Sequence, residues 1–172
     1  MRSMKRILLL LGLGALFTGF FLNIGGVDLL PDWLGSLFFA LGVTGLSRRP
    51  GMDRASTLSM IAWVLFATDL VVLFLQPDGV FSVGIGILFI ILETWMYLLT
   101  AALLDEQWPE ARLSLRPISV LGVTGAVGYV VTMASGSGII GVLCLLANIA
   151  MKVVFMVQLW RLVPYADSEE PF

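Results

Sequence analysis

The feature that most constrains this sequence is its series of long apolar segments. Each is about long enough to cross a bilayer as a helix, which takes roughly 20 predominantly apolar residues. A spanning segment must satisfy its backbone hydrogen bonds internally, so such segments become helices. We therefore expect an all-α fold, a polytopic transmembrane helical bundle, with one integral membrane domain over residues 1–172 and a short tail at 164–172. The six expected spans are 7–24, 29–46, 58–75, 80–104, 118–134 and 139–163.

The composition excludes most soluble and enzymatic alternatives. The chain is 59% hydrophobic and 13% charged, with a mean hydropathy of +0.99, whereas soluble domains carry about 25% charged residues. Histidine is absent and Cys144 is the only cysteine, so a Cys/His metal site and a Ser-His-Asp triad are both impossible. No basic patch with interleaved aromatic residues indicates a nucleic-acid partner. We expect no enzyme, no cofactor and no metal, and we expect the lipid bilayer as the main partner.

The first apolar segment also has the look of a signal peptide. It begins with basic residues and continues as an apolar run, MRSMKRILLLLGLGALFTGF. The run extends to Ile24 without an A-x-A cleavage site, which favours a retained first span over a cleaved signal.

The distribution of basic residues predicts how the chain is threaded. Loops rich in Lys and Arg stay on the cytoplasmic side of a membrane. Nine of the ten basic residues fall on one side of the six-span scheme, and the connections on the other side are short and lack Lys and Arg. We therefore expect three helical hairpins with both termini cytoplasmic. The nine are Arg2, Lys5, Arg6, Arg48, Arg49, Arg54, Arg112, Arg116 and Arg161.

The stretch DLLPDWLG places two carboxylates and a proline inside an otherwise apolar region. Pro31 suits the start of a helix, where its missing amide donor has no intrahelical partner to lose. Asp28 is expected as the N-cap, and Asp32 would face the positive end of the helix dipole. The alternative interpretation is an outer entry site for a cation or solute, formed by Asn23, Asp28 and Asp32, since cations such as Ca²⁺ prefer oxygen ligands.

The longer stretch NIGGVDLLPDWLG resembles the LLPD-x-x-G segment of small multi-spanning bacterial membrane proteins of uncharacterised function. The resemblance covers the first two expected helices. It implies a bacterial inner (plasma) membrane protein and brings no activity with it.

Ionisable residues inside the expected spans are the main candidates for function. Asp69, Glu93 and Lys152 fall well within spans, and charges at such depth normally pair, face the bundle interior or line a wet pathway. Glu93 and Lys152 lie at similar depth, which predicts an ion pair. Asn148 precedes Lys152 by one helical turn and lies on the same face. Asp69, Glu93, Asn148 and Lys152 are therefore expected to form one polar seam, in which Asp69 exchanges a proton or a cation.

Two functions fit these residues. One is a transporter of a small solute or ion that uses the polar seam as its pathway. The other is a non-catalytic structural or partner-binding subunit whose buried charges are architectural. Glycines at helical spacing, such as Gly35, Gly42 and Gly45, favour close helix packing, with the face of a homo-oligomer or of a membrane-protein partner as the alternative.

Overall fold

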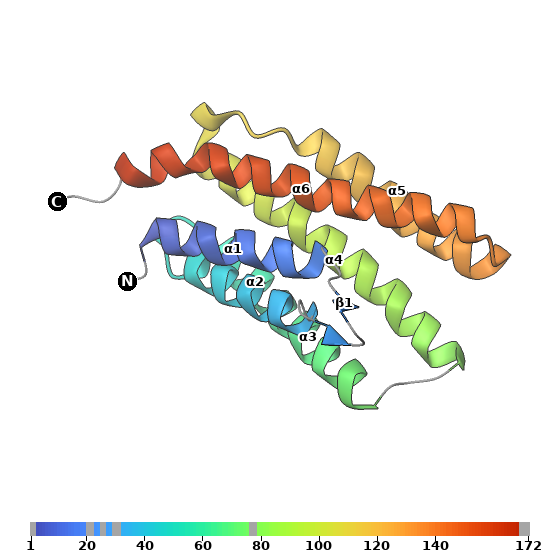
Figure 1. The fold of residues 1–172 in the computed structure, drawn as a ribbon. Helices are drawn as coiled ribbons and strands as arrows, with labels where there is room; N and C mark the ends of the chain where they lie inside the picture. The colour runs from blue at the N-terminus through green and yellow to red at the C-terminus, as the bar shows by residue number, and fades with distance from the viewer. Residues whose placement is uncertain (1–2, 20–22, 25–26, 29–31, 76–78, 169–172) are drawn as a thin grey trace.

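The computed structural model describes residues 3–19, 23–24, 27–28, 32–75 and 79–168, and these residues are almost entirely helical (Figure 1). The all-α prediction is confirmed. The α-helices are α1 (Met4–Gly19), α2 (Asp32–Ser47), α3 (Arg54–Leu75), α4 (Gly79–Gln107), α5 (Leu115–Ser135) and α6 (Gly138–Ser168). A short 3₁₀ helix, η1 (Pro109–Ala111), precedes α5, and two short strands, β1 (Asn23–Ile24) and β2 (Val27–Asp28), lie between α1 and α2.

The six helices alternate in direction along the bundle (Figure 1). Each helix packs against the next one in the chain, and α6 closes the ring against α1. The start of α1 and the end of α6 lie at the same end, here called the terminal end. The opposite end, where α5 ends and α6 begins, is called the distal end. The terminal end also holds the arginine-containing connections after α2 and α4.

Among the described residues, four helical segments are long and apolar enough to cross a membrane: Arg54–Leu75, Val83–Gln107, Leu115–Ser135 and Gly138–Ala166. They indicate an integral membrane protein. Large apolar side chains such as Phe74, Phe81 and Trp160 are about four-fifths exposed, at 79%, 80% and 79%, as expected for a surface in contact with lipid. The helices α1 and α2 have 16 residues each, a rise of only ~24 Å. The arrangement as six spans in three hairpins stays a prediction.

The region between α1 and α2 differs from the expected boundaries. The first span was predicted to reach residue 24, but Asn23 and Ile24 form β1, after α1 (Met4–Gly19). The second span was predicted to start at residue 29, and residues 29–31 lie outside the described residues. Between them Asn23 pairs with Asp28 and Ile24 with Val27 in an antiparallel ladder. The sequence here is NIGGVD, and Asn and Gly are weak helix formers. Asp28 lies in β2, and residues 29–31, which follow it, lie outside the described part of the chain, so its expected role as a helix N-cap stays a prediction.

Glycines bring α1 and α2 into backbone contact. A Cβ on Gly35 would lie 2.7 Å from the Thr18 amide nitrogen, and one on Gly14 would lie 2.9 Å from the Phe39 amide nitrogen. No side chain fits at such distances. Gly42 and Gly45 similarly face Leu11 and Ile7 of α1. The expectation that Gly35, Gly42 and Gly45 pack helices is confirmed, as membrane helices associate through small residues that allow close approach.

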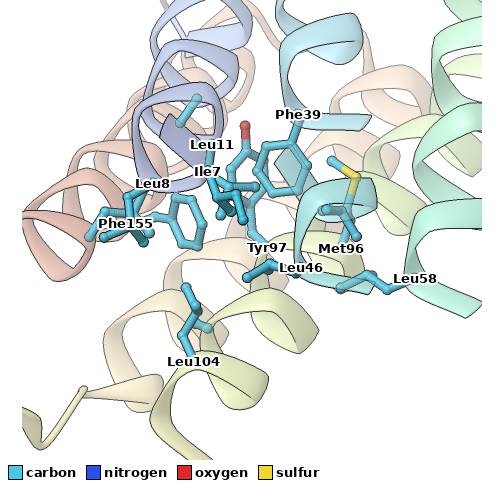
Figure 2. Close-up of a cluster of buried hydrophobic side chains, with 14 of the residues drawn as sticks. Ile7, Leu8, Leu11, Phe39, Leu46, Leu58, Met96, Tyr97, Leu104 and Phe155 are labelled. Atoms are coloured by element: carbon cyan, nitrogen blue, oxygen red, sulfur yellow. The ribbon is translucent and has the colours of Figure 1, made fainter. Parts of the chain in front are cut away.

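The core contains an aromatic cluster at the centre of the bundle. Tyr97 of α4 has its ring centroid 4.9 Å from that of Phe39 and 4.9 Å from that of Phe155, both edge-on. All three side chains are fully buried, and Figure 2 shows them among leucines and isoleucines from α1 and α2. Aromatic pairs in this geometry contribute about 0.5–1.5 kcal/mol beyond their buried area. The cluster joins α2, α4 and α6 just beside the ionisable residues.

Candidate functional site

A buried ion pair joins α4 to α6. The Lys152 ammonium lies 2.8 Å from the Glu93 carboxylate, and the two residues are only 3% and 5% exposed. Each lies 14 residues into its helix from the distal end, a depth of ~21 Å. The predicted pair is confirmed. Their equal depth explains the pairing, because Gly79 and Gly138 start the two helices at the same end of the bundle.

Thr18 ties this ion pair to α1. Lys152 Nζ donates a hydrogen bond of 2.6 Å to the Thr18 carbonyl oxygen. Thr18 is in the last turn of α1, where backbone carbonyls have no intrahelical partner and the helix dipole attracts a cation. A carbonyl near the end of α1 is thus the acceptor that Lys152 uses.

The Thr18 side chain extends the network to the aromatic cluster. Thr18 Oγ1 donates to the Gly14 carbonyl at 3.0 Å, so the 2.8 Å contact between Thr18 Oγ1 and Tyr97 Oη leaves the tyrosine as donor. Lys152 Nζ also lies 6.0 Å from the centroid of the Tyr97 ring, within range of a cation–π interaction. The sequence analysis did not identify Thr18. The one feature that could have pointed to it is a hydroxyl side chain near the end of an apolar helix.

A cavity of ≈ 430 Å³ lies on the distal side of the ion pair. It extends from Met133 and Gly141, near the distal ends of α5 and α6, to the pair itself. In Figure 1 the ribbons of α4, α5 and α6 extend farther toward the distal end than those of α1 and α2. Its wall is formed by Thr18, Gly19, Asp32, Gly86, Phe89, Ile90, Glu93, Tyr129, Thr132, Met133, Gly141, Cys144, Leu145, Asn148, Ile149 and Lys152.

The cavity brings together predicted site residues from separate parts of the sequence. Glu93, Asn148 and Lys152 line it, as the polar seam predicted. Asp32 also lines it, although sequence reasoning had placed Asp32 in a separate entry site. The start of α2 therefore contributes a carboxylate to the same space as the ion pair. For Asn23 and Asp28 the structure describes the backbone pairing of β1 with β2, and their side chains lie outside the described residues.

Asp69 lies apart from the cavity wall. Its carboxylate accepts a hydrogen bond from the Ser36 hydroxyl of α2, and the residue is half-buried between α2 and α3. It still interacts electrostatically with Glu93 and Lys152. The structure thus divides the expected seam into a lined cavity and a separate Asp69–Ser36 contact.

The groups on the cavity wall are ones that can bind a small molecule. Within the described part of the chain, no three His, Cys, Asp or Glu residues are grouped so as to hold a metal ion. The cavity instead offers two carboxylates, one ammonium, an amide and hydroxyls in a largely apolar wall. Comparison of the chain with protein-family models, curated proteins and solved structures found no match.

Proposed function

We propose that this chain is a transporter of a small solute or ion in a bacterial inner membrane. The proposal includes six spans arranged as three hairpins, with the terminal end on the cytoplasmic side. The observation that carries it is the cavity of ≈ 430 Å³ that ends on the buried Glu93–Lys152 pair. Ionisable groups inside a membrane are costly unless they serve a pathway or a partner, and here they adjoin a space large enough for a small molecule.

The packing on the two sides of the ion pair supports a carrier. On its distal side is the cavity, and on its terminal side is the aromatic cluster of Phe39, Tyr97 and Phe155, which is fully buried. Tyr97 follows Glu93 by four residues on α4, and Phe155 follows Lys152 by three on α6. A site that is hollow on one side and closed on the other is the arrangement expected of one state of an alternating-access carrier. The ion pair and the cluster would form its closed gate.

Asp69 is the proposed coupling residue. It is an ionisable group in an apolar helix, bound by Ser36 and within electrostatic reach of the ion pair. Binding or release of a proton or cation at Asp69 would therefore change the electric field at Glu93 and Lys152, and the bound proton or cation would not take up space in the cavity.

One observation favours the alternative of a structural or partner-binding subunit. Lys152 binds both Glu93 and the Thr18 carbonyl, and both members of the pair are at most 5% exposed. A network of this kind also fixes the register of α1, α4 and α6. Under this alternative the cavity would hold lipid or a partner side chain, and the protein would move no solute.

The test is transport by the purified chain in liposomes. A pH or sodium gradient is imposed, and uptake of ions and of a panel of labelled amines, carboxylates, amino acids and sugars is followed. We expect uptake of at least one solute, reduced at least tenfold by Asn148→Leu, which makes the cavity wall apolar. Gln107→Leu makes the same change at the exposed end of α4 and should leave uptake unchanged. Absence of flux for every ion and solute would refute the transporter and support the structural alternative.

A further inference from the structure

We propose that the cavity binds an amphiphilic organic cation, with an ammonium head and an apolar body of roughly one aromatic ring. This inference rests on the proposed transport function and names its substrate class. Three properties lead to it: the charge of the cavity wall, its apolar character, and the lack of a metal-binding cluster among the residues that the structure describes.

The charge of the cavity wall favours a cation. Its ionisable residues include two carboxylates, Asp32 and Glu93, and one ammonium, Lys152, which leaves a formal charge of −1. Lys152 is held by Glu93 and by the Thr18 carbonyl, so its charge is already balanced within the wall. A guest with a charge of +1 would bring the formal charge of wall and guest together to zero, whereas an anion would raise it to −2 in a medium of low dielectric constant.

The wider sequence strengthens this preference. Residues 7–47, 55–111 and 117–151 contain no Lys or Arg. Lys152 is therefore the only basic residue that the segments around the cavity supply.

The apolar part of the wall determines what kind of body the ligand can have. The lining includes the apolar side chains of Phe89, Ile90, Met133, Leu145 and Ile149, together with the Tyr129 ring. Such a wall binds hydrocarbon, and the aromatic faces attract an ammonium group. A volume of ≈ 430 Å³ is in the range of small-molecule pockets, about 300–1,000 Å³. A bare metal ion would need more oxygen ligands than the described residues group together.

Two glycines of α4 allow a matched pair of variants, one that displaces the Tyr129 side chain and one that does not. A Cβ on Gly86 would lie 2.4 Å from the Tyr129 hydroxyl, whereas one on Gly84 would meet no atom within 4 Å. Gly86→Ala must therefore displace the Tyr129 side chain from its place on the wall. Gly84→Ala makes the same chemical change on the same helix without touching the cavity.

The experiment measures binding to the full chain in lipid nanodiscs, with empty nanodiscs as the baseline. The probes share a phenyl body: phenethylammonium, neutral 2-phenylethanol and anionic 3-phenylpropionate. We expect phenethylammonium to bind at least tenfold more tightly than the other two. Asp32→Asn should weaken its binding at least fivefold and Asp32→Glu should preserve it, while Asp53→Asn, at an exposed residue of the terminal end, should have no effect. Gly86→Ala should weaken binding and Gly84→Ala should not.

The outcomes separate this inference from the function on which it rests. Equal binding of the three probes, preference for the anion, or binding indifferent to Asp32→Asn and Gly86→Ala would overturn the organic-cation site. If liposome uptake is found for anionic or neutral solutes only, the transporter stands and the substrate class is wrong. If neither binding nor flux is found, both proposals fail. Melting temperatures of each variant show whether a loss of binding reflects a loss of fold.

Discussion

Removing one member of the buried ion pair should destabilise the protein strongly, and Lys152→Met tests this. Methionine keeps an unbranched stem that can pack beside Gly19, whose added Cβ would lie 3.2 Å from Lys152 Cδ. It removes only the charged end. Any change in stability therefore reports the ammonium rather than the loss of side-chain volume.

The expected magnitude follows from burial and from the partners that remain. Glu93 is 5% exposed and loses its partner at 2.8 Å, while the Thr18 carbonyl loses a charged donor at 2.6 Å. Removing one partner of a buried pair costs about 3–5 kcal/mol, chiefly because a charge is left buried and uncompensated. Replacing both partners by apolar residues removes that charge, so Glu93→Leu/Lys152→Met should recover at least half of the loss.

The assay is the free energy of unfolding in mixed micelles, measured by denaturant titration. Arg54→Met is the matched control, because the Arg54–Glu106 pair is 3.5 Å long with side chains 82% and 66% exposed. Removal of such a surface pair should cost no more than about 1 kcal/mol. If Lys152→Met costs no more than Arg54→Met, or if the double variant is less stable than Lys152→Met alone, the ion pair does not hold α1, α4 and α6 together as reasoned here.

Three further predictions concern packing, coupling and orientation. Gly35→Ala should lower the free energy of unfolding by about 1–3 kcal/mol through overpacking against α1, whereas Gly84→Ala, which meets no atom within 4 Å, should be nearly neutral in the same titration. The asparagine of Asp69→Asn can still accept a hydrogen bond from Ser36, so the melting temperature of this variant should stay close to that of the unmodified chain. Its gradient-driven solute uptake should fall. Unchanged uptake would count against the coupling role. A reporter fused after Phe172 should be active in the bacterial cytoplasm, and activity confined to the periplasmic side would contradict the proposed threading.

Sequence reasoning found the ion pair because depth along a helix can be counted. Glu93 and Lys152 lie equally far from the turns that begin their helices, and the rise per residue is fixed. No comparable rule predicts how a helix is rotated about its axis when nearly every face is apolar. Asp69 shows the consequence. It was expected in one polar seam with Asn148, whereas its side chain contacts Ser36 of the neighbouring α2.

The sequence alone determined the class of this protein, an all-helical chain built of long apolar segments, because bilayer thickness and backbone hydrogen bonding leave such segments few alternatives. Tertiary structure alone decided the site. Lys152 of α6 binds the Thr18 carbonyl of α1, and Asp32 of α2 lies with Glu93 and Lys152 on the wall of one cavity. These residues come from four different helices. They meet only when the helices pack side by side, so no single segment of the sequence encodes the cavity.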